Sequence, residues 1–143
     1  MFRGEHEYQL DDRFRTSLPK DWRVELRHGG FLTRGWDHAI FLFPWEAWLE
    51  IEKKIAEIRV TDLRGDVIRR FLMGGDECWL DAQGRVVISP PLRTYGNLQK
   101  DLIVRGVGRF IEIWSRERWL AYQAQKFEPD LIAKLASELN LDI

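Results

Sequence analysis

The feature that most constrains this chain is an internal repeat. When the 143-residue sequence is compared with itself at an offset of 70 residues, residues 2–15 align with residues 72–85 without a gap. Five of these fourteen positions are identical, namely Gly4/Gly74, Glu7/Glu77, Leu10/Leu80, Asp11/Asp81 and Arg15/Arg85. Because self-similarity at a fixed period marks a repeated structural unit, we expect two copies of one unit, at residues 1–70 and 71–143.

Each unit begins with a predicted β-hairpin. Residues 8–10 and 15–18 are short β-prone runs around the segment 11–14, and residues 78–80 and 85–88 flank the segment 81–84 in the same way. The Asp that opens each segment can accept a hydrogen bond from a backbone N–H two residues further on. Gly84 can adopt the positive φ that closes such a loop.

Further elements follow in the same order in both halves. Pro favours the first turn of a helix, glycine favours its end, and apolar residues at spacings of three and four indicate one buried helical face. In the first half we expect a short helix after Pro19 that ends at Gly29-Gly30, strands at 31–34 and 39–43, and a longer helix after Pro44. In the second half we expect a short helix after Pro90 that ends at Gly96-Asn97, strands at 102–105 and 110–114, and a longer helix after Ser115. A helix at about 62–73 is expected to link the halves, and a C-terminal helix is expected from Pro129.

The apolar content is sufficient for a packed core. Hydrophobic residues make up 45% of the chain, with seven Trp and eight Phe. A unit of about 70 residues is only marginally stable alone, so we expect the two halves to form one body. Trp45, Trp48 and Trp119 lie in apolar helical stripes, which favours core or subunit contacts over stacking on nucleic-acid bases. The stripe that continues from Trp48 through Ile51, Ile55 and Ile58 could equally pack against a second chain.

Membrane insertion, export and thiol chemistry are not expected. The most apolar run, residues 39–49, is interrupted by Pro44 and Glu46 and is shorter than the roughly 18 residues that a membrane span needs. The N-terminus lacks the apolar core of a signal peptide, so we expect a cytoplasmic protein. The single cysteine, Cys78, has apolar neighbours, which indicates a small buried side chain.

Enzyme motifs are missing from the sequence. His6, His28 and His38 are scattered, without the Cys/His or His/Glu spacing of a metal site. The glycines at 74–75 and 106–108 do not extend to a phosphate-binding fingerprint. We therefore expect no catalysis, no metal and no cofactor.

Three segments resemble the MraZ family of bacterial transcriptional regulators: Met1-Phe2-Arg3-Gly4, Leu10-Asp11-x-x-x-Arg15-x-Ser17-Leu18-Pro19 and Glu77-Cys78-x-Leu80-Asp81-x-x-Gly84-Arg85-x-x-Ile88. The resemblance covers nearly the whole chain. It implies an α+β fold, a tandem pseudo-symmetric swapped-hairpin β-barrel of the AbrB-like kind with flanking helices. It also implies a nucleoid-associated regulator, assembled as a homo-oligomeric ring, that binds short tandem repeats in double-stranded DNA ahead of the cell-division and cell-wall gene cluster.

The resemblance also implies which residues contact DNA. These are Arg15 and Arg85, with Asp11 and Asp81 as their motif partners and Arg3 as a weaker candidate. The planar guanidinium of Arg can donate two parallel hydrogen bonds to guanine O6 and N7, and a two-stranded ribbon fits the major groove.

The first turn departs from the family pattern, because Phe14 stands where glycine is usual before the Arg. A Phe at positive φ is strained, so the first turn is expected to differ in shape or position. This leaves the projection of Arg15 more open than that of Arg85.

Two alternatives stay open. Each Asp and its Arg could pair with each other and fix only the shape of the hairpin. The chain could also be a protein-interaction scaffold of the same fold without DNA affinity, since its net charge of −1 argues against a uniformly basic surface. DNA binding would then need a local basic surface, or a weak site repeated by oligomerisation. Solvated charge is the favoured interpretation of Arg13, Lys20, Arg23 and Arg27.

Overall fold

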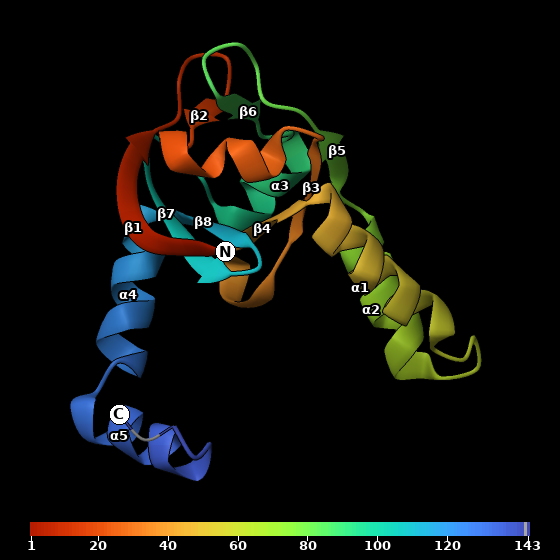
Figure 1. Ribbon diagram of the computed structural model, residues 1–143, viewed down its shortest axis with the longest axis vertical. Helices are drawn as coiled ribbons and strands as arrows, with labels where there is room; N and C mark the ends of the chain where they lie inside the picture. Colours follow the sequence, from red (N-terminus) through yellow and green to blue (C-terminus); the bar gives the residue numbers. More distant parts are fainter. Residues whose placement is uncertain (142) are drawn as a thin grey trace.

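The computed structural model describes residues 1–141 and 143 and shows an α+β fold around an antiparallel sheet (Figure 1). The strands are β1 (Phe2–Gln9), β2 (Arg15–Ser17), β3 (Gly30–Arg34), β4 (Ile40–Pro44), β5 (Asp76–Cys78), β6 (Arg85–Val87), β7 (Asp101–Gly108) and β8 (Ile111–Ser115). The α-helices are α1 (Trp45–Glu57), α2 (Leu63–Met73), α3 (Pro90–Gly96), α4 (Arg116–Lys126) and α5 (Pro129–Glu138). Short 3-10 turns are η1 (Lys20–Trp22), η2 (Val24–Leu26) and η3 (Trp36–His38).

Both sheets combine strands from the two halves of the sequence. One sheet has the order β1-β7-β8-β4-β3-β5, and the other is the pair β2-β6. In the large sheet, β1 of the first half pairs with β7 of the second, and β3 pairs with β5. The α+β class and the exchange of strands between halves are therefore confirmed.

The two strands of each predicted hairpin do not pair with each other, in agreement with the swapped hairpins that the resemblance implies. β1 pairs with β7 along its whole length, from Phe2 opposite Gly108 to Gln9 opposite Asp101. β2 pairs with β6 instead of β1, with Thr16 opposite Val86. Turn-forming residues predict where a turn lies, but they do not predict which strand pairs with which. Every extended segment has the same backbone donors and acceptors to offer. The partner is decided by the packing of the whole body.

β1 is much longer than the predicted run at residues 8–10. Its residues are exposed and mostly charged between Arg3 and Glu7, so no apolar alternation marks it as a strand. It is an edge strand that relies on β7 for its hydrogen bonds and on ion pairs such as Arg105–Glu5 at 3.0 Å. Charge on an exposed edge also opposes pairing with the edge of another molecule.

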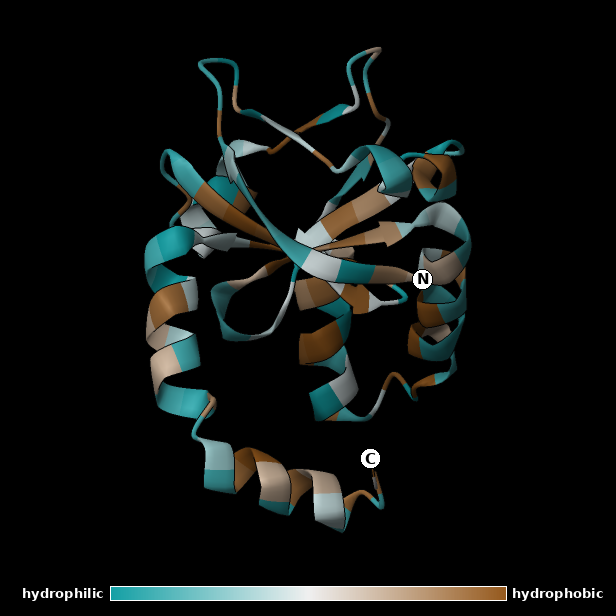
Figure 2. Ribbon diagram, turned by 60° about the vertical axis from the view of Figure 1, so that its left-hand side comes forward, coloured by the Kyte–Doolittle hydropathy of each residue, from teal (hydrophilic) through white to brown (hydrophobic). Residues whose placement is uncertain are grey.

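The core has two layers because both faces of the sheet are covered. Alternate residues of β4 point to opposite faces, so Ile40 and Leu42 join one apolar cluster and Phe41 and Phe43 join the other. The first cluster packs against β2, β6 and α3, and includes Leu18, Val86, Ile88 and Leu92. The second packs against the helices, and includes Trp48, Ile55, Leu72 and Trp119. In Figure 2 the apolar strands cross the middle of the body, and two loops project together from one end.

The helices largely match their predicted positions. Trp48 and Trp119 are each 1% exposed, which confirms them as core residues, and Trp45 is partly buried beside the same cluster. Ser115 caps α4 by accepting the N–H of Arg118, as its position indicates. The short helix expected after Pro19 is wrong in type, because the backbone there forms the 3-10 turns η1 and η2, whose N–H groups bond to carbonyls three residues back.

The helix α5 extends away from the sheet beyond the end of α4 (Figure 1). Its apolar residues Leu131, Ile132 and Leu135 are each about 40% exposed, and none of its residues is buried. Within the described residues, no helix combines the length and the hydrophobicity that crossing a membrane requires.

Replacing Trp48 with Ala should lower the free energy of unfolding by about 3–5 kcal/mol, because it removes a fully buried indole and leaves a cavity. Urea unfolding followed by circular dichroism measures the loss. Trp79→Ala is the matched control, since Trp79 is 65% exposed and its removal should cost less than about 1 kcal/mol. Equal losses in the two variants would contradict the two-layer core.

Candidate nucleic-acid interface

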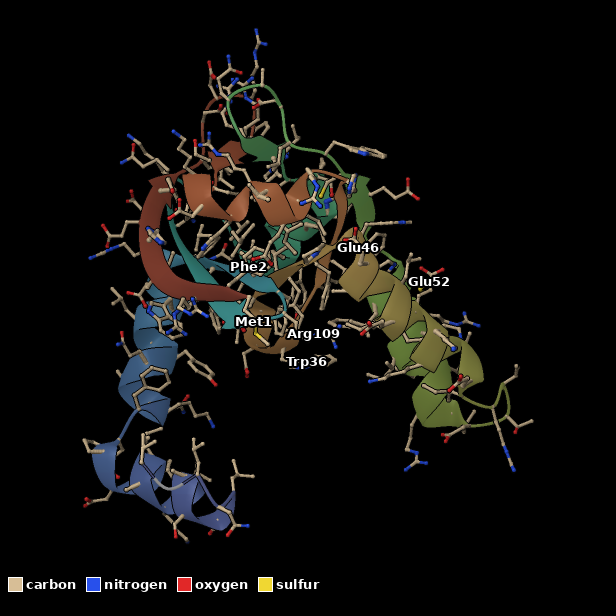
Figure 3. All side chains as sticks on the ribbon, viewed as in Figure 1. Met1, Phe2, Trp36, Glu46, Glu52 and Arg109 are labelled. Carbon is tan, nitrogen blue, oxygen red and sulfur yellow. The ribbon has the colours of Figure 1, made fainter. Side chains whose placement is uncertain are left out.

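Two equivalent turns lie side by side at one end of the molecule. One joins β1 to β2 and the other joins β5 to β6 (Figures 1 and 2). Nitrogen- and oxygen-bearing side chains crowd this end in Figure 3. The loop between α1 and α2 lies at the opposite end of the body (Figure 1).

The first turn is built around the carboxylate of Asp11. One oxygen accepts the backbone N–H groups of Arg13 at 2.9 Å and Arg15 at 2.8 Å. The other accepts the Nε–H of Arg15 at 2.7 Å. The backbone N–H of Asp11 donates in return to the carbonyl of Arg15 at 2.9 Å, and Phe14 donates to the carbonyl of Asp11. One side chain therefore fixes both the turn and the arginine that follows it.

The second turn repeats this geometry around Asp81. Its carboxylate accepts the backbone N–H groups of Gln83 and Arg85, each at 2.9 Å, and the Nε–H of Arg85 at 2.8 Å. The expected pairing of each Asp with the Arg four residues later is therefore confirmed. Such pairing is compatible with contact to DNA, because it uses only the Nε edge of each guanidinium.

Each turn is bound to the half of the chain that does not contain it. The N–H of Leu18 donates to the carbonyl of Gly84 at 3.2 Å, and the N–H of Ile88 donates to the carbonyl of Phe14 at 2.9 Å. Arg23 donates to the carbonyl of Leu18 in one half, and Arg93 donates to the carbonyl of Ile88 in the other. The two turns thus form a single platform.

The expectation that Phe14 alters the first turn is wrong. Phe14 has φ 61°, close to the 75° of Gly84 at the equivalent position. The guanidinium of Arg93 lies 3.6 Å from the centre of the Phe14 ring, a cation–π contact that offsets part of the strain. At Gly84 a Cβ would lie 2.1 Å from Nε of Arg23, so a side chain there would displace Arg23 as well as adopt positive φ.

The terminal nitrogens of Arg15 make fewer contacts within the chain than those of Arg85. The side chains of Arg15 and Arg85 are 21% and 27% exposed, so neither is sequestered. Nη2 of Arg85 donates to Gln83 at 3.2 Å, and Nη1 lies 4.0 Å from the carboxylate of Asp11. Among the described residues, the terminal nitrogens of Arg15 form no such contact.

Arg3 is not brought together with the other two arginines. It is exposed in β1 opposite Val107, close to Phe2, which Figure 3 places in the middle of the body. At about 3.3 Å per residue, the strand carries Arg3 roughly 25 Å along its path from the first turn. A contact of Arg3 with DNA would have to involve another part of the duplex.

Two exposed residues lie at the tips of the turns, Arg13, which the sequence analysis interprets as solvated charge, and Gln83, to which it gives no role. Both stand two positions after the bracing Asp, and their backbone N–H groups bond to it. That spacing, two residues after the Asp that opens each turn, is the signal in the sequence that could locate them.

The bracing hydrogen bonds lower the pKa of both aspartates below their ordinary value of 3.8. At Asp11, partial desolvation raises the pKa, but the hydrogen bonds from Arg15 and Arg13 together outweigh it. At Asp81, the backbone N–H of Arg85 is the largest influence and lowers the pKa, with its side chain adding to the effect. By contrast, burial raises the pKa of the Cys78 thiol to about 12, in agreement with an unreactive side chain.

Comparison with known proteins decides the family. A family model described as "MraZ protein, putative antitoxin-like" matches residues 1–70 and again residues 71–142. The chain belongs to the MraZ family. A similar relative, "Transcriptional regulator MraZ" from Clostridium tetani, is 36% identical over 143 residues, which is 99% of this chain and 100% of the relative.

Two further MraZ relatives are similar over most of their length. The protein of the same name from Natranaerobius thermophilus is 40% identical over 87% of this chain and 88% of its own. The one from Syntrophomonas wolfei is 41% identical over 85% of this chain and 86% of its own. These names describe transcriptional regulators and no class of enzyme.

In this MraZ-family chain, Phe14→Gly should be more stable than Phe14→Ala by about 1 kcal/mol, because glycine adopts positive φ without strain and neither variant keeps the contact with Arg93. Thermal unfolding measures the difference. Gly84→Ala should destabilise more than either, since it introduces a side chain at positive φ and displaces Arg23 from its position beside Gly84. Indifference to alanine at position 84 would contradict the structure of the second turn.

The bracing bonds should also make stability depend on pH in the acid range. Because the folded-state pKa values of Asp11 and Asp81 are lowered, their contribution is complete above pH 3.8 and is lost as the pH falls through the folded-state values. A carboxyl NMR titration of wild type and Arg15→Ala tests this. The pKa of Asp11 should rise toward 3.8 in the variant while that of Asp81 stays low; an unchanged Asp11 would contradict the brace.

Proposed function

We propose that this chain is a sequence-specific DNA-binding transcriptional regulator that binds short tandem promoter repeats ahead of the cell-division and cell-wall gene cluster. The observation that carries the proposal is the pair of equivalent turns at one end, each with an arginine braced by an aspartate. The regulator names of the relatives support the same class.

The braced arginines suit the recognition of DNA. The bond from Nε to the aspartate fixes the plane of each guanidinium, so little side-chain entropy remains to be lost on binding. The outer edge of Arg15 stays available for two hydrogen bonds to guanine or to a phosphate. Two turns side by side present these groups on a rigid platform, as a ribbon that enters the major groove requires.

A single chain provides a weak site, so we propose that several copies bind together. The net charge of −1 limits attraction to phosphates, and one or two arginines discriminate too little to select a site in a genome. Repetition on closely spaced DNA boxes raises the effective concentration. We therefore propose a nucleoid-associated homo-oligomer, arranged as a ring, in which the units 1–70 and 71–143 of each copy supply one turn each.

We propose that the copies join where α5 of one chain meets an apolar hollow of the next. The hollow, about 370 Å³, is lined by aromatic and aliphatic side chains, with Lys54 and Arg109 among the lining residues. α5 presents apolar residues with acidic ones at both ends, Asp130 and Glu138, which complement Lys54, whereas Arg109 pairs with Glu50 of its own chain. A helix of ten residues is marginal in isolation, so it needs a partner surface.

Binding to promoter DNA should weaken steeply with salt, because the counterions released scale with the phosphates contacted. Arg15→Ala should weaken binding by about tenfold or more, and Arg85→Ala by less, because Nη2 of Arg85 already donates to Gln83. Fluorescence anisotropy with a promoter fragment carrying tandem repeats measures both. Arg59→Ala, an exposed arginine in the loop between α1 and α2, is the control and should bind like wild type.

The absence of measurable binding to the promoter fragment at low salt would contradict DNA binding and favour the alternative, a protein-interaction scaffold of the same fold without DNA affinity. Full binding by both arginine variants would instead remove Arg15 and Arg85 from the DNA-binding site.

Leu135→Glu should reduce the molar mass of the assembly in solution, because it places a charge in the apolar face of α5. Size-exclusion chromatography with light scattering measures the mass. Lys134→Ala, on the neighbouring position of α5, is the control. If the mass of the Leu135→Glu variant equals that of wild type, α5 is not the subunit contact.

A further inference from the structure

We infer that the apolar hollow described above is a binding site for a small straight-chain carboxylate, and that this ligand displaces α5 of the neighbouring chain. The displacement rests on the proposed contact between α5 and the hollow, whereas the binding of the carboxylate rests on the hollow alone. Such a ligand makes the assembly, and with it the affinity for DNA, respond to a small molecule.

The hollow has the size and the lining of a small-molecule site. Its volume of about 370 Å³ falls within the range of roughly 300–1,000 Å³ that such sites occupy. Phe41, Phe43 and Trp48 of the lining belong to the second core layer and are each 5% exposed or less. Ile51 and Val107 add aliphatic surface to the lining. The shape is therefore set by the packed core and does not have to form around a ligand.

One lining residue is held in place by a strained turn. Trp36 belongs to η3, between β3 and β4, where Asp37 and His38 have positive φ values of 58° and 67°. Neither is glycine, and such strain persists only where the surroundings hold it. Here Tyr95 of α3 does so, because its hydroxyl donates to the carbonyl of Gly35 and its carbonyl lies 2.9 Å from Nδ1 of His38. Strain that is held in this way is typical of ligand sites.

The indole of Trp36 offers apolar surface at the opening of the hollow. It is 52% exposed, although it stacks on Phe71 with ring centres 6.2 Å apart and meets Phe41 edge-on at 5.9 Å. Figure 3 shows Trp36 beside Arg109, which lies between β7 and β8 and also lines the hollow. A ligand that covers the free surface of the indole therefore also comes close to a charged part of the rim.

The charge of the lining favours an anion. Lys54 and Arg109 are its two ionisable residues. Arg109 pairs with Glu50, whereas Lys54 is exposed and forms no ion pair among the described residues. Burying a charge against apolar side chains is costly, so the ligand must be uncharged along its length and carry its charge at the end that meets the ammonium. A straight acyl chain with one terminal carboxylate meets both requirements.

α5 has the same chemistry as this ligand. Its aliphatic residues Leu131, Ile132 and Leu135 lie between the carboxylates of Asp130 and Glu138. A hollow that accepts this helix presents the same surface to a free acyl carboxylate, so the two occupants exclude each other. Loss of the contact between chains lowers the effective concentration of turns on repeated DNA boxes, and the DNA is released.

Isothermal titration calorimetry of the full-length protein with hexanoate, octanoate and decanoate tests the binding. The probes are kept below the concentrations at which they form micelles. The affinity should rise by about fourfold for each added methylene, because the chain is buried against apolar side chains. An affinity that does not depend on chain length would overturn the inference.

Two variants test the position of the ligand. Lys54→Gln should weaken the binding of octanoate by about two- to fivefold and leave that of octanol unchanged, because only the carboxylate meets the ammonium. Lys53→Gln is the matched control, since Lys53 is exposed and does not line the hollow. Val107→Trp enlarges an exposed lining residue and should weaken the binding of both probes by about tenfold or more. Wild-type affinity in a Val107→Trp variant that circular dichroism shows to be folded would overturn the inference.

Light scattering tests the displacement. Decanoate should lower the molar mass of the wild-type assembly, and Leu135→Glu should bind decanoate more tightly than wild type, because its hollow is vacant. If decanoate binds to neither protein, the inference is overturned, while the contact of α5 and the binding of DNA stand. If decanoate binds to both equally without a change in mass, the displacement is overturned. When Leu135→Glu in addition keeps the wild-type mass, it is the proposed contact of α5 that fails.

Discussion

The platform depends on a carboxylate that binds three N–H groups of its own turn. In each half, the aspartate accepts two backbone N–H groups and the Nε–H of the arginine four residues later. These bonds replace the cross-strand ladder that a closed hairpin would supply, because β1 and β2 do not pair with each other. The brace lets the chain leave the turn toward the other half, and the amides of Leu18 and Ile88 then bind the opposite turns.

The same arrangement explains how one turn carries Phe where the other carries Gly. Positions 14 and 84 both have positive φ, so the backbone conformation is the same in the two turns. The difference lies in the arginine across the platform, because Arg23 occupies the space beside Gly84 while Arg93 stacks on the ring of Phe14. A shared backbone with unlike side chains gives the molecule two stable tips of different chemistry.

Much of this could be predicted from residue patterns, and the remainder has a physical cause. The turns, the cap at Ser115, and the burial of Trp48 and Trp119 follow from local rules of hydrogen bonding and periodicity. The pairing of β1 with β7 does not, because charged edge residues such as Arg3 and Glu5 carry no apolar alternation. At the candidate site, Asp11, Arg15, Asp81 and Arg85 were predicted together. The greater freedom of Arg15 was hidden, since it depends on Gln83 reaching back to Arg85.

Hydrogen exchange at the amides of Leu18 and Ile88 tests the central claim, that the two turns hold each other across the halves. Both amides donate to the opposite turn, and both side chains are fully buried. The structure predicts that the two amides exchange slowly and at similar rates, with a free energy of opening near that of global unfolding. Fast exchange at either amide, with the amides of β4 and β8 still protected, would show that a turn opens independently and would contradict the account.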